Sequence, residues 1–119
     1  MFRAALALAC LPALPVLAQD FAPVTDRAEF LSAMEGRDLH MGLFSLVLNL
    51  TPDGAIDGSA LGWAITGTWD WQDGYFCREM DWSGMEIVYD CQLVEVRDGK
   101  RMRFTERRGE GDSASFDLR

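Results

Sequence analysis

The sequence contains few of the side chains that most metal sites use. It has one histidine, His40, and three cysteines, Cys10, Cys77 and Cys91. A structural zinc site usually needs four cysteine or histidine ligands, and a multi-histidine centre needs more than one histidine. The sequence therefore predicts no metal site of either kind.

Positive charge is also scarce. Lysine occurs once, and the 11 basic residues face 19 acidic ones, which gives a formal net charge of −8. Nucleic-acid binding needs a basic surface, and docking on anionic lipid needs basic residues too. The composition therefore argues against nucleic acid and against a membrane surface as partners, and it leaves solubility or attraction of a cationic partner as explanations.

A long apolar run occurs only at the N-terminus, over residues 4–16. A membrane-spanning helix needs roughly 20 apolar residues, whereas this run is shorter and contains Pro12 and Pro15, which disrupt helix interiors. Small residues, Val16 and Ala18, follow at the spacing that signal peptidase prefers. We therefore predict a cleavable signal peptide.

Cleavage after Ala18 divides the chain into a signal peptide, residues 1–18, and one domain, residues 19–119, exported to the periplasm. Because the signal peptide removes Arg3 and no acidic residue, the domain keeps 10 basic and 19 acidic residues, a formal charge of −9. An uncleaved anchor and a lipoprotein attached at Cys10 are the remaining alternatives.

The domain begins with a leader and one helix. We expect residues 19–24 to be a flexible leader. Thr25 or Asp26 can cap the following helix, and Glu29 suits a capping box. Gly36 is a natural helix end. Between them lies an apolar stripe at helical spacing that should face the core: Phe30, Leu31 and Met34.

After Gly36 the pattern changes to short strands. Residues 44–50 alternate between apolar and other side chains with a period of two. Turn signals recur between the later stretches, as Asp53-Gly54, Asp73-Gly74, Ser83-Gly84 and Asp98-Gly99. We therefore predict a mainly β domain, an antiparallel meander that forms a small barrel or a strongly curved sheet, with one N-terminal helix.

Two cysteines remain after export, and two in a small exported domain most often form a disulfide. If Cys77 lies opposite Cys91 in a hairpin that turns at Ser83-Gly84, the same register pairs Arg78 with Asp90, Phe76 with Gln92 and Met80 with Val88. The opposition of Arg78 and Asp90 supports this register, because opposite charges stabilise cross-strand pairs. The sequence thus predicts a Cys77–Cys91 disulfide.

Aromatic residues cluster just before and within this hairpin. They either fill a small core or line a partly open apolar pocket. On the second interpretation, five side chains are candidate contacts to a ligand or partner: Trp69, Trp71, Tyr75, Arg78 and Trp82.

Catalytic motifs are hard to find. The carboxylates beside the aromatic cluster, Glu79, Asp81 and Asp90, have the chemistry of a general acid and base, but solvated charges on a hairpin are common. Gly111-Asp112-Ser113 matches a hydrolase nucleophile block only superficially, since that block needs a strand-to-helix turn and a later histidine, whereas His40 precedes it. We predict no catalytic residue and lean against an enzyme.

Several motifs together resemble a family of small exported alphaproteobacterial proteins without an established role. The first is Gly-Thr-Trp-Asp-Trp-Gln-Asp-Gly-Tyr-Phe-Cys-Arg-Glu at 67–79, and the others span 82–84, 90–92, 103–105 and 108–114. The resemblance covers nearly all of the mature chain. Some members carry the automated label dihydrodipicolinate reductase, which implies a nicotinamide dinucleotide on a parallel βαβ fold with a Gly-x-Gly-x-x-Gly loop.

That label fits this sequence poorly. No Gly-x-Gly-x-x-Gly loop follows a strand, and the pathway of such an enzyme is cytoplasmic. We therefore carry over no catalytic residue and predict no cofactor. The favoured hypothesis is a non-catalytic periplasmic binding domain for a small apolar ligand or an envelope protein. An enzyme, including the labelled reductase, and a structural envelope component are the alternatives.

Overall fold

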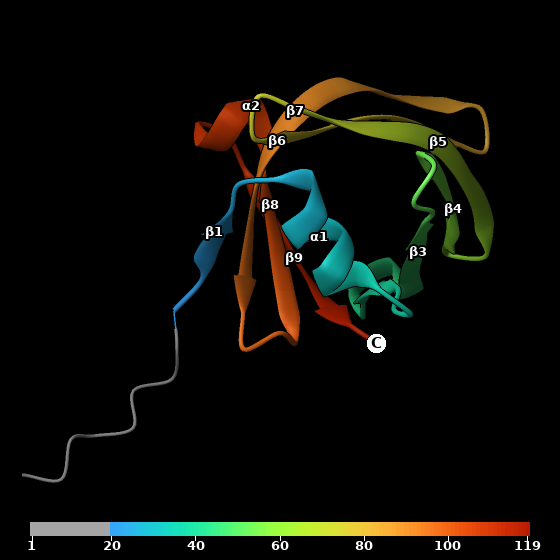
Figure 1. Ribbon diagram of the computed structural model, residues 1–119. Coiled ribbons are helices and arrows are strands. Elements are labelled where there is room, and N and C mark those ends of the chain that lie inside the picture. The colour runs from blue at the N-terminus through green and yellow to red at the C-terminus, as the bar shows by residue number, and fades with distance from the viewer. Residues whose placement is uncertain (1–19) are drawn as a thin grey trace, which may run out of the picture.

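The computed structural model describes residues 20–119 (Figure 1). The predicted signal peptide and its cleavage site lie outside the described residues. Within the described part of the chain, no helix has both the length and the apolar character that crossing a membrane requires.

The elements follow one another with short connections. In chain order they are β1 Ala22–Val24, α1 Arg27–Met34, β2 Leu39–Met41, the 3-10 turn η1 Leu43–Ser45, β3 Leu46–Leu50, β4 Ala55–Ala60, β5 Trp63–Gln72, β6 Tyr75–Trp82, β7 Met85–Arg97, β8 Arg101–Thr105, the short turn α2 Glu106–Gly109, and β9 Ser113–Leu118.

Strands β2 to β9 form a closed antiparallel barrel, so the predicted meander is confirmed. Each of these strands pairs with its neighbour in the chain, and β9 returns to pair with β2. The closing pairs are Leu39 with Leu118 and His40 with Asp117. Closure pairs each of these eight strands with two others, so the sheet is a barrel and not an open curved sheet.

The expected leader is partly structured. Residues Ala22–Val24 form β1, which pairs antiparallel with Val94–Val96 at the end of β7. Val24 is fully buried there. The expectation of a flexible leader is therefore wrong for these three residues, because β7 extends past the end of β6 and offers β1 a free edge.

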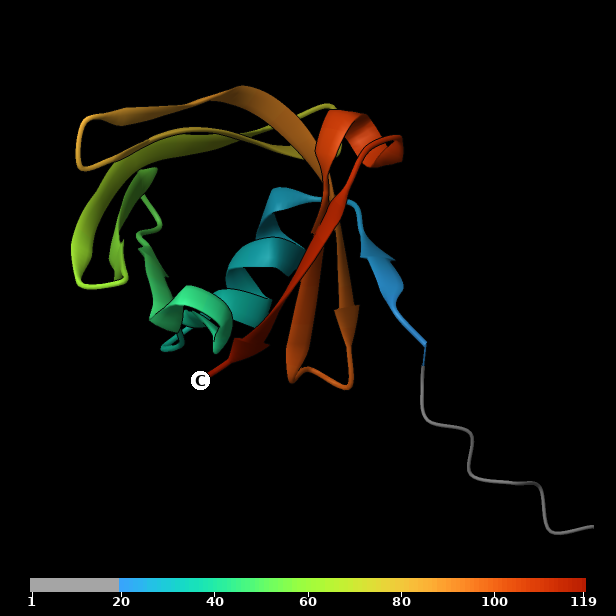
Figure 2. The same ribbon diagram turned by 180° about the vertical axis from the view of Figure 1, so that it is seen from behind.

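The predicted helix is present and capped as expected. The side chain of Asp26 accepts a hydrogen bond of 2.8 Å from the backbone N–H of Glu29, and the Glu29 carboxylate faces the N–H of Thr25 at 3.4 Å. In Figures 1 and 2, α1 lies inside the curve of the sheet. Phe30 is fully buried and inserts between Trp69, Trp71 and Phe76, at ring-centroid distances of 5.2–5.3 Å. The helix is thus anchored on the inner face of β5 and β6.

The β6–β7 hairpin contains the predicted disulfide, and three of the four predicted pairs are correct. Cys77 lies opposite and bonded to Cys91, Arg78 pairs with Asp90, and Phe76 pairs with Gln92. Met80, however, pairs with Ile87 and not with Val88.

A β-bulge on β7 accounts for the difference. The two-residue turn at Ser83 and Gly84, both with positive φ, pairs Trp82 with Met85. The pairing of Trp82 with Met85 and the pairing of Cys77 with Cys91 belong to registers that differ by one residue. The extra residue is absorbed where Val88 and Tyr89 together oppose Glu79. Their side chains are 67% and 53% exposed, so the bulge changes the direction in which the side chains of this part of β7 point.

Candidate functional site

Trp69, the first of the five candidate residues, belongs to the core. It is 5% exposed and contacts Phe30 and Phe76, with ring centroids 5.3 Å and 5.7 Å away. Its indole N–H donates to the backbone oxygen of Thr51 at 3.0 Å. The ring is therefore enclosed on several sides, and its polar atom is satisfied within the protein.

The other aromatic candidates also make contacts within the protein. Trp71 stacks on Phe30, and its indole N–H is buried without a hydrogen-bond partner among residues 20–119. The ring of Tyr75 lies 5.2 Å from the guanidinium of Arg108. The indole N–H of Trp82 donates to the oxygen of Ala60 at 3.1 Å. The structure thus brings Trp69 and Trp71 together around α1, and it places Tyr75 and Trp82 elsewhere.

A cavity of about 180 Å³ lies in the barrel lumen. Residues from strands β2, β3, β4, β6, β7, β8 and β9 line it, together with one residue of α2. Most of its wall is aliphatic or aromatic and includes Leu48, Ile56, Phe76, Met80, Phe104 and Phe116. Arg78 is the one sequence-predicted candidate that lines this lumen.

The lumen has a polar side, formed by Arg78, Gln92 and Glu106. Arg78 and Gln92 are each only 8% exposed, whereas Glu106 on α2 is exposed. The Arg78 Nη1 donates to the backbone oxygen of Val88 at 2.6 Å. The bulge that displaces Val88 from the predicted register is therefore next to the lumen, and its carbonyl holds the arginine.

Arg78 is a buried cation without a close ion pair. Within the described part of the chain, no carboxylate oxygen forms a salt bridge with its guanidinium. Burial lowers the pKa of Arg78, and the negative charges of Asp90 and Glu106 offset part of that effect. Because a guanidinium titrates far above neutral pH, the side chain keeps its charge. The apolar lumen thus contains one fixed positive charge.

Sequence reasoning identified Arg78 but missed Gln92 and Glu106. The hairpin register already paired Gln92 with Phe76, which places Gln92 on the same face as Arg78 because side chains alternate along a strand. The sequence therefore contained a signal for the position of Gln92. It contained no such signal for Glu106, since Glu106 lies in a turn where Arg107 and Arg108 adopt positive φ.

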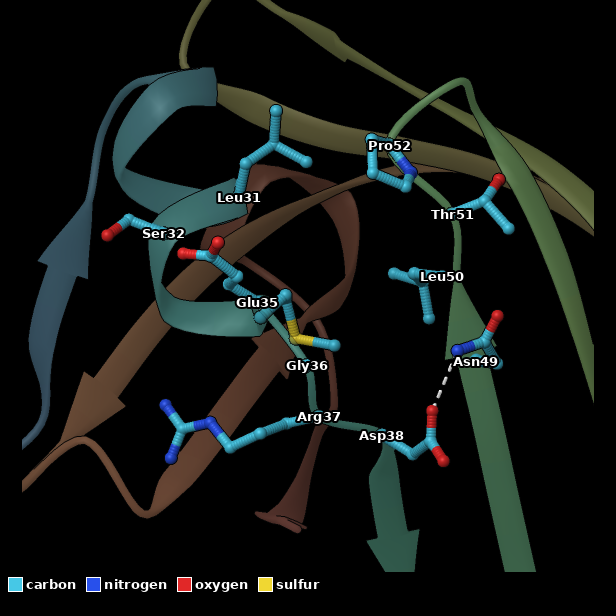
Figure 3. Close-up of a pocket in the computed structure, with 11 residues that line it drawn as sticks. Leu31, Ser32, Glu35, Gly36, Arg37, Asp38, Asn49, Leu50, Thr51 and Pro52 are labelled. Atoms are coloured by element: carbon cyan, nitrogen blue, oxygen red, sulfur yellow. Dashed lines mark hydrogen bonds between the residues drawn. The ribbon is translucent and has the colours of Figure 1, made fainter.

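A second, larger hollow of about 690 Å³ lies between α1 and β3 (Figure 3). It is open to the surface, and several of its polar side chains bind one another or the backbone. Asn49 donates to the Asp38 carboxylate at 2.8 Å, and Arg37 donates to the oxygen of Ala33 at 2.6 Å. Because these groups already have partners, this hollow is a weaker candidate for a ligand site than the lumen.

One end of the barrel exposes large apolar side chains on three connections and at the starts of the strands that follow two of them. They are more than 45% exposed and comprise Leu43, Phe44, Leu61, Trp63 and Met85. The N–H of Leu61 bonds the oxygen of Phe44, and Ser83 bonds Ala64, so the three connections are adjacent. We call this set the apolar rim.

No protein-family model matches the chain, and comparisons with curated proteins and with solved structures found no match either. Among residues 20–119, no group of three or more His, Cys, Asp or Glu side chains is placed to hold a metal ion. The interpretation of the site therefore rests on the geometry of the lumen.

Proposed function

We propose that the protein is a non-catalytic binding domain of the periplasm, and that the barrel lumen holds the apolar part of a small molecule. The observation that carries this proposal is the lumen cavity, which is lined by residues from seven of the eight barrel strands. In other proteins, an apolar cavity of about 150 Å³ takes up a molecule the size of benzene. The ligand is then a single ring or a chain of about six carbons.

The chemistry of the lumen suits binding. Apolar walls favour uptake of a hydrocarbon group through the hydrophobic effect, at about 0.8 kcal/mol for each buried methylene. Six such groups give about 5 kcal/mol, which limits the dissociation constant for a purely apolar ligand to about 0.1–1 mM. Arg78 does not exchange its proton near neutral pH, so it serves to orient a ligand and not to transfer protons.

The periplasmic location rests on two features. One is the signal peptide predicted over residues 1–18, and the other is the Cys77–Cys91 disulfide. Disulfides persist in oxidising compartments and are rare in the cytosol.

The lumen is tested with hexan-1-ol as the probe. Titration should produce saturable NMR shifts at the methyl groups of Leu48 and Ile56 in the lumen, and not at the exposed methyl groups of Leu61. Ala114→Leu adds three carbons inside the lumen, since Ala114 lines the cavity, and it should abolish these shifts. Ala64→Leu, on the exposed side of β5, is the matched control and should retain them.

Two results would contradict the lumen proposal. One is a set of shifts that spreads over exposed methyl groups without saturation. The other is undiminished binding by an Ala114→Leu variant whose melting temperature matches that of the parent.

A second candidate function is contact with an envelope protein partner, and the apolar rim favours it. Monomeric proteins rarely expose large contiguous apolar patches without a role. Trp63, at 63% exposed, is the largest side chain of the rim, and tryptophan is enriched among residues that dominate binding energy.

The rim is tested by photo-crosslinking in exporting cells. A crosslinking residue at position 63 should give one adduct of defined mass, and Leu61→Ser should remove that adduct. The same residue at position 98, in the exposed turn between β7 and β8, should give none. Equal adducts from both positions would indicate non-specific contact and rule out this candidate.

A further inference from the structure

The polar groups of the lumen lie together on two neighbouring strands. Arg78 comes from β6 and Gln92 from β7, and they are diagonal neighbours because Arg78 pairs with Asp90 and Gln92 with Phe76. Diagonal neighbours on one face of a sheet are within reach of each other's longer side chains. The lumen therefore presents N–H donors from two buried residues at one place on an otherwise apolar wall.

The guanidinium of Arg78 has donors to spare. It carries five N–H donors in a planar fork, and the structure assigns one nitrogen to a protein acceptor, Nη1 to the Val88 oxygen. A planar guanidinium matches the two oxygens of a carboxylate, and such charge-assisted hydrogen bonds are about twice as strong as neutral ones. Burial strengthens them further, because water screens the pair less.

The negative charges near Arg78 affect which anions can bind there. Asp90 and Glu106 act on Arg78 from nearby, and the Asp90 carboxylate accepts the backbone N–H of Arg107 at 3.1 Å. These two negative charges repel any anion that approaches, and they repel a dianion about twice as strongly as a monoanion. The acidic groups near Arg78 thus disfavour a dianion more than a monoanion.

We propose that the lumen binds a monocarboxylate, with the hydrocarbon part in the cavity and the carboxylate on Arg78, where the Gln92 amide offers a further donor. This inference rests on the proposed function, because it names the chemical class of the molecule that the lumen takes. The cavity volume limits the hydrocarbon part to a short aliphatic chain or a single ring.

The test compares three probes of equal chain length by calorimetry on the mature, disulfide-bonded protein: hexanoate, hexan-1-ol and hexylamine. Hexanoate should bind at least about tenfold more tightly than hexan-1-ol, as a charge-assisted hydrogen bond predicts. Hexylamine should bind more weakly than both. In Arg78→Met the advantage of hexanoate should disappear while hexan-1-ol still binds.

The outcomes separate this inference from the proposed function. Equal binding of hexanoate and hexan-1-ol would leave the lumen as an apolar site and refute the carboxylate inference. Preference for hexylamine would also refute it, since Glu106 would then be the recognising group. If none of the three probes binds, the proposed function itself fails. The comparison of probes on the parent protein decides the matter even if Arg78→Met does not fold.

Discussion

Trp69→Ala is expected to lower the free energy of unfolding by about 4 kcal/mol, the loss typical of removing a buried large aromatic ring. Trp69 is 5% exposed, contacts Phe30 and Phe76, and donates its indole N–H to Thr51. The substitution would leave a cavity beside α1 and remove the hydrogen bond to Thr51. Urea denaturation followed by circular dichroism measures the loss.

Trp63→Ala is the matched control, because Trp63 begins the same strand but is 63% exposed. It should change the free energy of unfolding by no more than about 0.5 kcal/mol. Domains of this size are stable by only about 5–15 kcal/mol, so the Trp69 variant should lose a large part of its stability. Similar losses for both variants would contradict the inward orientation of Trp69.

Removal of the Cys77–Cys91 disulfide is expected to cost about 3 kcal/mol, because the bond closes a loop of about 15 residues and so limits the unfolded chain. The double variant Cys77→Ala and Cys91→Ala is preferable to serine, since Cys77 is 1% exposed and a serine hydroxyl would be buried there. The midpoint of urea unfolding, measured at equal pH and salt, gives the loss.

Reduction of the parent protein provides the control for the disulfide. A reducing agent should lower the parent's midpoint to near that of the double variant and leave the variant unchanged. If reduction has no effect on the parent, the bond does not contribute to stability. Lumen binding of hexan-1-ol should survive in the double variant below its melting temperature, because both cysteines lie outside the cavity lining.

Much of the fold was predictable because its contacts are local. Each barrel strand pairs with the next one along the chain, and two-residue turns such as Asp73-Gly74 mark the hairpins. The β-bulge on β7 was predictable as well. A turn at Ser83-Gly84 and a disulfide between Cys77 and Cys91 require registers one residue apart, so one residue has to be left over between them.

The lumen was not predictable, because it depends on pairings between distant parts of the chain. Nothing in the sequence near Leu39 or Leu118 indicates that they lie opposite each other. The position of α1 inside the curve of the sheet was equally hidden, although its apolar stripe was clear. Phe30 occupies the space that an open pocket between Trp69 and Trp71 would need. The aromatic cluster therefore belongs to the core, and the cavity lies farther along the lumen.

The seam between β2 and β9 has a consequence for the order of folding. Asp38 and Arg119 exchange backbone hydrogen bonds of 2.6 Å and 3.0 Å, beside the pairs that join Leu39 and His40 to β9. The barrel therefore cannot close until residues 117–119 are available. A segment without these residues has open strand edges and no complete core, so it gains little from folding early. The pairing of β2 with β9 thus makes closure of the barrel wait for its last strand.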